Sequence, residues 1–276
     1  MDEIYSLDVA ALSAISGKRI VVVDDDTDLY YEMALSLYSE IETNNKKNTA
    51  TVCILPVGPV FQYRRFIRLL KWKPLDLSGL HVFFMDEYLD EEMKLIHPSN
   101  PLSFAGFIER EFVTPMPEEF NLNQDQMHFP NPEQPEAFDE EIEHLGGISL
   151  CHAGVGIVGH LAFNEPAEDE DVEQFSKLPT RIVKLTRETI TINSHTAMNG
   201  ALERIPEFAI TVGIKQILSS RKIRICFNRP WQRTVFRKAL CWKPTAKFPV
   251  TLTQMHPDVE YIVTKAVAQP PDFALR

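Results

Sequence analysis

The sequence predicts an α/β protein built on a mostly parallel β-sheet with helices on both faces. Its strand-like segments are apolar throughout, which is typical of strands that are buried on both sides. Segments with helical spacing of apolar residues separate them, as in repeated strand–helix–strand units. The 276 residues are 44% hydrophobic and 24% charged, so the chain can bury a full core. We therefore expect residues 1–276 to form a single domain.

The first half of the chain alternates strand and helix. Residues 20–23 form a short β-branched run, and Leu29, Met33, Leu37 and Ile41 follow it at helical spacing. The next segments are expected to be a strand, a helix, a strand and a second helix, at residues 51–55, 63–70, 81–85 and 102–112. A segment rich in Pro and Asn then follows at residues 115–135.

The second half repeats the alternation. A helix is expected to end before Gly146 and Gly147, which suit the left-handed conformation that closes many helices. Further strands are predicted at residues 148–151, 182–185, 208–212, 223–227 and 261–263. Because open α/β sheets bind ligands at the carboxyl ends of their strands, the residues that follow each strand are the candidates for function.

Charge and targeting signals narrow the class of protein. The 28 basic and 39 acidic residues give a net charge of −11, which argues against a nucleic-acid partner and a membrane surface. No apolar run of about 18 residues is present. The start Met1-Asp2-Glu3 is acidic where a signal peptide is basic. Scattered thiols without a C-x-x-C pair predict reduced cysteines and a cytoplasmic location. The cysteines are Cys53, Cys151, Cys226 and Cys241.

An acidic run, Asp24–Asp28, follows the first predicted strand and has two interpretations. It resembles the D-x-D-x-T motif of phosphatases that form an aspartyl-phosphate, but Thr27 comes one residue too early. Acidic side chains at this place also cap the first amides of a helix and complement its dipole. The sequence favours capping.

A glycine motif follows the predicted strand at 148–151. Gly154, Gly156 and Gly159 read as G-x-G-x-x-G, the pattern of dinucleotide-binding loops. Such a loop opens a helix, whereas Pro166 and acidic residues would end any helix here quickly. The glycines therefore indicate a backbone that approaches a small ligand closely rather than a nicotinamide site.

A histidine and two carboxylates are the candidates for catalysis. His160 and Glu165 lie in the loop that follows the glycines, and Asp86 follows the predicted strand at 81–85. Imidazole titrates near neutral pH, and a carboxylate can act as its partner or as a second base. Together, these groups suit proton abstraction next to a carbonyl.

Segments spread over nearly the whole chain identify a family resemblance. Gly159–Pro166 reads G-H-L-A-F-N-E-P, and Phe84–Leu89 reads F-M-D-E-Y-L. The other matching segments are His97-Pro98, Gly146-Gly147-Ile148, Gly154-Val155-Gly156, Thr180-Arg181-Ile182, Asn193-Ser194, Ala209–Gly213 and Gln254–Pro257. Together they resemble the glucosamine-6-phosphate deaminase/isomerase family.

The resemblance implies a modified Rossmann-like fold related to ribose-5-phosphate isomerases. It also implies that an aminosugar phosphate is converted to a ketose phosphate and ammonia without a redox cofactor. No metal is expected, because the His, Asp and Glu residues lack a convincing ligand spacing. His160 would assist opening of the sugar ring, Glu165 would hold that histidine, and Asp86 would move a proton between C2 and C1. The substrate is expected to contact Gly58, Glu87, Gly154, Gly156, Gly159, Asn164, Arg181, His195 and Arg233. Family members often form oligomers, so a homo-oligomer is the expected assembly.

Three departures from the family pattern leave the exact activity open. Val158 stands where the family has an aspartate that orients the histidine. The phosphate loop is shortened to residues 56–61 and lacks its hydroxyl donors, although the next helix could still attract an anion through its first amides. His195 replaces a phosphate-binding arginine, and Arg64 and Arg65 are either substitutes or solvated surface residues.

Two hypotheses follow, with a third that is weaker. The first is an aldose–ketose isomerase and deaminase that acts on a sugar phosphate or aminosugar phosphate. The alternative is a catalytically weakened or silent sensor that binds such a phosphate on the same fold. A lactonase of the 6-phosphogluconolactonase group is disfavoured, because the F-N-E-P and M-D-E-Y segments resemble deaminases.

Overall fold

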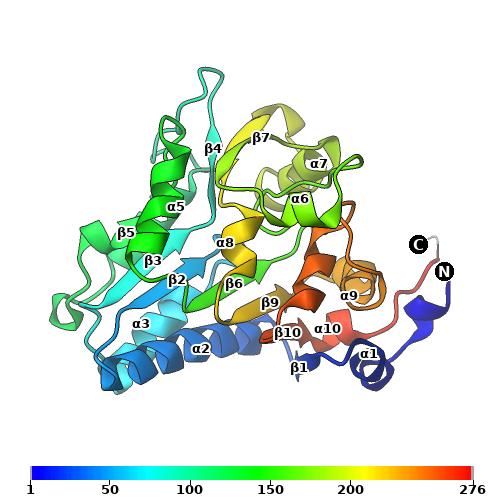
Figure 1. Cartoon of the computed structure of the whole chain (residues 1–276), viewed down its shortest axis with the longest axis horizontal. Coiled ribbons are helices and arrows are strands. Elements are labelled where there is room, and N and C mark those ends of the chain that lie inside the picture. The colour runs from blue at the N-terminus through cyan, green and yellow to red at the C-terminus, as the bar shows by residue number, and fades with distance from the viewer. Residues whose placement is uncertain (1, 275–276) are drawn as a thin grey trace.

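The computed structural model describes residues 2–274 and contains a seven-stranded parallel sheet, in the order β1-β10-β9-β6-β2-β3-β5 (Figure 1). The strands are β1 (Arg19–Val23), β2 (Thr51–Leu55), β3 (Leu80–Phe84), β5 (Met127–His128), β6 (Leu150–Gly154), β9 (Ile223–Phe227) and β10 (Val259–Thr264). The prediction of a mostly parallel α/β sheet is confirmed.

Helices cover both faces of this sheet (Figure 1). The α-helices of the described residues are α1 (Val9–Ser16), α2 (Asp26–Lys46), α3 (Gln62–Trp72), α4 (Phe104–Ile108), α5 (Pro135–His144), α6 (Val172–Ser176), α7 (Arg187–Ala197), α8 (Ile214–Leu218), α9 (Gln232–Cys241) and α10 (Lys265–Ala268), of which α7 packs on the smaller sheet described below. A π-helical turn, Glu109–Val113, continues α4, so the helix expected near 102–112 changes its winding midway. No helix of residues 2–274 is long and apolar enough to cross a bilayer.

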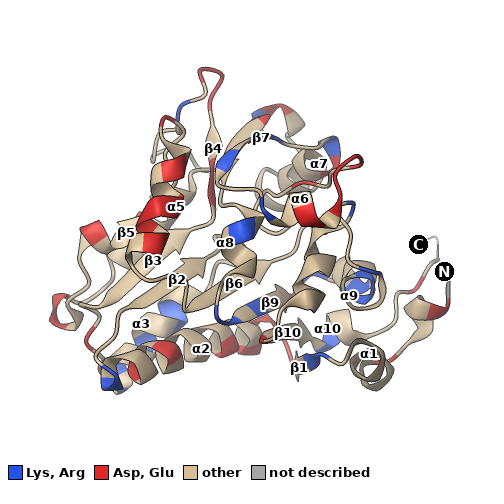
Figure 2. Cartoon of the chain, in the orientation of Figure 1, with Lys and Arg blue, Asp and Glu red and all other residues tan. Residues whose placement is uncertain are grey.

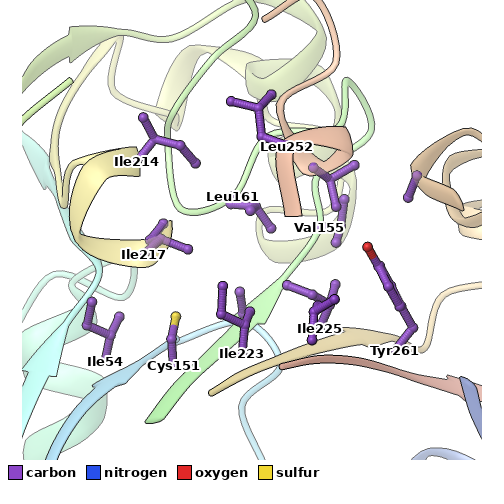
Figure 3. Close-up of a cluster of buried hydrophobic side chains, with 14 of the residues drawn as sticks. Ile54, Cys151, Val155, Leu161, Ile214, Ile217, Ile223, Ile225, Leu252 and Tyr261 are labelled. Carbon is purple, nitrogen blue, oxygen red and sulfur yellow. The ribbon is translucent and has the colours of Figure 1, made fainter. Parts of the chain in front are cut away.

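Strand β2 shows why these segments are apolar at every position. All five of its residues are buried, and they alternate between two cores. Val52 and Ile54 face the core beneath α5, α8 and α9, whereas Cys53 and Leu55 face the core beneath α2 and α3. The side-chain period of two therefore buries both faces of the strand. Figure 3 shows part of the first core.

A second, antiparallel sheet stands beside the main one. Its order is β4-β8-β7, with β4 (Asp86–Leu89), β7 (Arg181–Lys184) and β8 (Phe208–Thr211). The strands expected near 182–185 and 208–212 exist, but they pair here and not in the parallel sheet. Met85 alone separates β3 from β4, so the chain passes from the large sheet into the small one within a residue. This turn places Asp86 between the two sheets.

Two local predictions are confirmed at the ends of helices. Asp25 caps α2, because its carboxylate accepts hydrogen bonds from the amides of Thr27 and Asp28 at 2.7 and 3.2 Å. Gly146 and Gly147 follow α5 with positive φ angles of 88° and 81°. The acidic run is therefore used for capping, as the sequence favours.

Candidate active site

A cavity of about 350 Å³ opens at the carboxyl ends of β2, β3, β6 and β9. Its floor is formed by the loops that follow these strands, and Asp86 and His160 both line it. One face of α7 closes it from above, with Ile192, Asn193 and Thr196 on its wall. Residues 74 positions apart in the chain thus meet at the edge of the sheet where α/β proteins bind ligands.

The glycine loop is shaped by two close approaches. A Cβ atom on Gly154 would lie 2.2 Å from the carbonyl oxygen of Gly58, so the loops after β6 and β2 touch only because Gly154 has no side chain. A Cβ on Gly156 would lie 2.0 Å from Nε2 of His160, so the imidazole ring rests directly on this glycine. No helix opens at Gly159, which excludes the dinucleotide-binding loop that the G-x-G-x-x-G pattern suggested.

The hydrogen bonds around His160 fix its orientation. Its Nδ1 lies 3.4 Å from Oε2 of Glu165 and 3.2 Å from Oγ1 of Thr189. A carboxylate can only accept, so these contacts assign the proton of a neutral ring to Nδ1. The free electron pair is then on Nε2, which lies against Gly156 at the cavity. The ring is thus set up to accept a proton from a bound molecule.

Glu165 is held at the start of α7. Thr186 caps this helix, and its amide and hydroxyl donate to the two carboxylate oxygens of Glu165 at 3.4 and 3.1 Å. Burial alone would raise the pKa of Glu165, but hydrogen bonds from His160, Thr189 and Thr186, with the charge of His160, outweigh it and lower the pKa. Glu165 is therefore ionised and able to orient the imidazole.

Asp86 is a buried carboxyl group with a different environment. It is 7% exposed, and burial raises its pKa well above the ordinary range, to which the adjacent Glu87 adds. Its side chain makes no hydrogen bond within residues 2–274. A carboxylate that is largely buried and accepts no hydrogen bond from the protein is a stronger base, which is what abstraction of a carbon-bound proton requires.

The predicted contact residues fall into two groups. Gly58, Gly154 and Gly156 line the cavity. Glu87 does not: it is 1% exposed and accepts four hydrogen bonds, from the amides of residues 88, 104 and 105 and from the Ser103 hydroxyl. Glu87 therefore fixes the start of α4 and is not available to a substrate.

Gly159 and Asn164 also support the loop from outside the cavity lining. Gly159 has a φ of +80° and the ring of Phe248 packed against it. The Asn164 amide donates to the carbonyls of Leu161 and Val212 at 3.0 and 2.9 Å. These residues shape the loop that carries His160.

The structure does not bring the three predicted phosphate-binding cations to the cavity. Arg181 donates to Asn164 Oδ1 at 2.9 Å and lies along the outer groove beside α5. Arg233 donates to the carbonyl of Ala266 at 2.7 Å, next to α10. His195 is exposed on α7. Because the cavity side of α7 carries residues 192, 193, 196 and 197, helical geometry turns position 195 away from it.

The two suggested substitutes are also engaged elsewhere. Arg64 forms an ion pair with Glu111, and the Arg65 guanidinium lies over the rings of Tyr30 and Tyr31, at 5.2 and 5.7 Å from their centroids. Neither lines the cavity. Within residues 2–274, no group of three or more His, Cys, Asp or Glu side chains could hold a metal ion.

Several polar cavity residues were missed by the sequence analysis. They are Tyr88, Asn193, Thr196, Asn228, Arg229 and Gln232. Asn228 and Arg229 follow β9 directly, so the rule that directs attention to strand ends would have found them. Asn193 donates to the hydroxyl of Tyr88 at 2.9 Å. No local sequence pattern predicts this contact between α7 and β4.

A parallel α/β sheet that carries a histidine–carboxylate pair and a second buried carboxylate at its carboxyl edge defines an enzyme with groups for proton transfer. The chain is 30% identical over 247 residues to a glucosamine-6-phosphate deaminase of Thermoanaerobacter pseudethanolicus, which covers 87% of this chain and 91% of the relative. The chain therefore belongs to the glucosamine-6-phosphate deaminase family, and the resemblance seen in the sequence is confirmed.

Solved structures share the fold at lower identity. A structure described as a monomeric glucosamine-6-phosphate deaminase matches with a TM-score of 0.78 and 22% identity, over 91% of this chain and 98% of that chain. A 6-phosphogluconolactonase of Thermotoga maritima matches with a TM-score of 0.65 and 13% identity, over 90% and 100%. No family model matches the chain. The family gives the protein a deaminase/isomerase type of function on sugar phosphates.

Proposed function

We propose that the protein converts an aminosugar phosphate, of the type of glucosamine 6-phosphate, into a ketose phosphate and ammonia. One observation carries the proposal: a single cavity is lined by a buried carboxyl group, Asp86, and by an imidazole, His160, that a second carboxylate orients. These are the base and the acid–base pair that ring opening and isomerisation require.

Ring opening uses His160. Its Nε2 accepts the proton of the hydroxyl on C1 while the bond from C1 to the ring oxygen breaks. The imidazolium then returns a proton to that ring oxygen, and the open aldehyde results. Glu165 stabilises the positive ring formed between these two steps, because its carboxylate lies 3.4 Å from Nδ1.

Proton transfer between carbons uses Asp86. The ionised carboxyl removes the proton from C2 while the substrate's ammonium group on C2 gives a proton to the oxygen on C1, which yields an enolamine. The carboxyl then delivers its proton to C1. The resulting imine at C2 is hydrolysed by water to the ketone and ammonia. Exclusion of Asp86 from water favours this step, because desolvation makes the carboxylate a stronger base.

The departure at Val158 is offset by Thr189. Val158 has no acceptor for the imidazole, but Oγ1 of Thr189 lies 3.2 Å from Nδ1 of His160 and 3.0 Å from Oγ1 of Thr186. The threonines and Glu165 together hold the ring without a second aspartate. An active enzyme is therefore the leading proposal, and a silent sugar-phosphate sensor is the alternative that Val158 motivates.

The test is incubation of the purified protein with glucosamine 6-phosphate, with ammonia and ketose phosphate measured together. The proposal expects equal amounts of both. A sensor would instead show thermal stabilisation by the sugar phosphate without either product. If only Val158→Asp gives turnover, the natural chain is the silent sensor and the orienting aspartate is the group it lacks.

A further inference from the structure

We infer that Arg229 recognises the substrate phosphate from a position at which the family pattern does not place a cation; this inference rests on the proposed function and deepens it. Among the described residues that line the cavity, Arg229 alone carries a permanent positive charge. The arginines and the histidine expected from the sequence lie outside the cavity, as shown above. The loop at residues 56–61 also lacks the hydroxyl donors of the family pattern.

The Arg229 side chain is available to a ligand. It is exposed, and within residues 2–274 its guanidinium has no hydrogen bond or ion pair. Its backbone, in contrast, is fixed, because the amide donates to Oε1 of Gln232 at 2.8 Å. Gln232 also accepts from the amide of Asn228, which holds the turn between β9 and α9. A free guanidinium on a fixed backbone suits bidentate recognition of a phosphate.

The carboxylate that contacts the neighbouring residue, Asn228, is that of Asp26. Asp26 accepts from Nδ2 of Asn228 at 3.2 Å, and the same amide group donates to the hydroxyl of Tyr30 at 3.2 Å. Asp26 lies in the first turn of α2 and does not line the cavity. Among the described residues that line the cavity, Asp86 is the one carboxylate, and it follows a strand three positions away from β9 in the sheet.

The position of Arg229 matches the shape of the proposed substrate. Along the sheet, β9 is followed by β6, β2 and β3, so Arg229 and Asp86 follow strands that are three spacings apart. At the usual strand spacing this is about 14 Å between backbones, which the two side chains shorten. In a hexose 6-phosphate the reacting carbons, C1 and C2, are at one end and the phosphate at the other. Asp86 is placed to contact the end with the reacting carbons, and Arg229 to contact the phosphate.

The test compares binding of three probes, glucosamine 6-phosphate, glucosamine and inorganic phosphate, by calorimetry. The variant is Arg229→Met, with Arg229→Lys to keep the charge. Arg68→Met is the matched control, because Arg68 is exposed on α3 and lies over the ring of Trp72. We expect Arg229→Met to weaken the binding of glucosamine 6-phosphate about 10- to 100-fold, which is the range for the loss of a hydrogen bond to a charged group. Glucosamine should be unaffected, and Arg229→Lys should be intermediate.

Two results would overturn the inference. One is that wild type and Arg229→Met bind glucosamine 6-phosphate equally well. The other is that the wild type binds glucosamine 6-phosphate no more tightly than glucosamine and does not bind inorganic phosphate. The proposed function fails separately. If the wild type binds phosphate through Arg229 but releases no ammonia, Arg229 keeps its role and the deaminase proposal is wrong.

Discussion

At the scale of single residues, the chemistry depends on hydroxyl and carboxylate groups around one imidazole. Asp86, His160 and Glu165 could be selected from the sequence because each follows a strand or a glycine loop. Thr189 could not, because a threonine inside a helix carries no local signal that it will contact a histidine 29 residues earlier. The sequence also could not show that Arg181 and Arg233 lie outside the cavity, because their positions depend on how β7 and α9 pack.

The hydroxyl of Thr189 gives the first prediction. Thr189→Val keeps the shape of the side chain but removes the partner of Nδ1, so His160 loses one of its two orienting contacts. We expect kcat to fall about 10- to 100-fold with little change in KM, since one hydrogen bond near a charge is removed. Thr189→Ser should restore most of the rate. The control is Thr191→Val, which is exposed on the same helix.

A steady-state kinetic comparison decides this. Equal loss of kcat in Thr189→Val and Thr189→Ser would show that packing, and not the hydroxyl, positions the ring.

Asp86 gives a prediction about stability as well as rate. Because its pKa is raised in the folded state, the native protein keeps a proton that the unfolded chain has lost above about pH 4. Stability therefore falls as pH rises above about 4, until Asp86 ionises in the native state too. Asp86→Asn removes this loss, so we expect a variant without turnover that melts higher than wild type at pH 7.

Melting curves from pH 4 to pH 8 measure the effect. The advantage of Asp86→Asn should grow with pH and disappear near pH 4. A variant that melts below wild type at pH 7 would show that the Asp86 carboxylate stabilises the fold, contrary to its environment.

At the scale of elements, six of the seven parallel strands were predictable, whereas β5 lies in the segment rich in Pro and Asn where no strand was expected. The pairing in the second sheet was not predictable either. Residues 223–227 match β9, and β2 matches residues 51–55, because continuous apolar runs mark doubly buried strands. The pairing of β8 with β4 on one side and β7 on the other depends on a turn at Met85 that no residue pattern marks. The sequence therefore predicted the floor of the site but not the second sheet above it.

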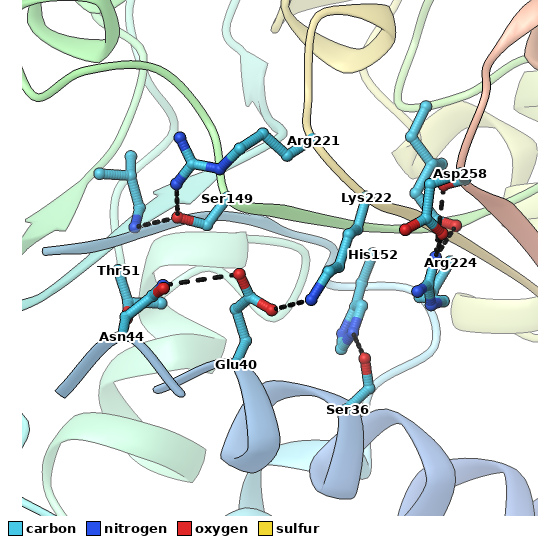
Figure 4. A network of polar contacts seen from close by, with 12 residues as sticks. Ser36, Glu40, Asn44, Thr51, Ser149, His152, Arg221, Lys222, Arg224 and Asp258 are labelled. Atoms are coloured by element: carbon cyan, nitrogen blue, oxygen red, sulfur yellow. Dashed lines mark hydrogen bonds and ion pairs between the residues drawn. The ribbon is translucent and has the colours of Figure 1, made fainter. Parts of the chain in front are cut away.

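The edge of the sheet opposite the cavity holds a polar network (Figure 4). Lys222 pairs with Glu40 at 2.6 Å, and Arg224 pairs with Asp258 at 2.8 Å. His152 on β6 is 1% exposed, with Nε2 3.2 Å from the hydroxyl of Ser36. Burial, with the charge of Arg224, lowers the pKa of His152 to about 3.

His152 therefore gives a pH prediction for the fold. Below about pH 6.5 the unfolded chain protonates this histidine while the native chain does not. The free energy of unfolding therefore decreases as the pH is lowered, by about 1.4 kcal/mol for each pH unit. His152→Gln removes this dependence. When the pH is lowered from 7 to 4.5, we expect the free energy of unfolding of the variant to decrease by about 2–3 kcal/mol less than that of the wild type.

Urea unfolding at the two pH values measures that difference. The control is His144→Gln, at an exposed histidine on α5, and it should follow wild type. If His152→Gln loses stability with acid as steeply as wild type, His152 does not titrate in the manner inferred.

At the scale of the whole molecule, the N-terminal and C-terminal segments of residues 2–274 lie close together, with the ring centroids of Tyr5 and Phe273 5.4 Å apart (Figure 1). Arg237 of α9 is fully buried, and its guanidinium donates to the carbonyls of Leu7, Val267 and Ala268 at 3.0, 3.5 and 2.9 Å. The N-terminal and C-terminal segments are thus tied to the core by one side chain. Figure 2 shows acidic and basic residues interspersed along the chain, with several acidic residues on α5.

Arg237 gives a prediction for the whole chain, which we propose to unfold as one domain. Arg237→Met leaves several buried carbonyls without a donor, so we expect a loss of about 3 kcal/mol in unfolding free energy. Near- and far-ultraviolet circular dichroism should report one shared transition in both proteins. Two separate transitions in the wild type would contradict a single domain.

The most direct test of the account is the reaction of glucosamine 6-phosphate with the wild-type protein in heavy water. If Asp86 exchanges its proton with solvent between removal from C2 and delivery to C1, the ketose phosphate will carry deuterium on C1 and will appear with an equal amount of ammonia. Asp86→Asn should give neither product. Full turnover by Asp86→Asn, or no product with the wild type, would contradict the claim that Asp86 and His160 act together in this cavity.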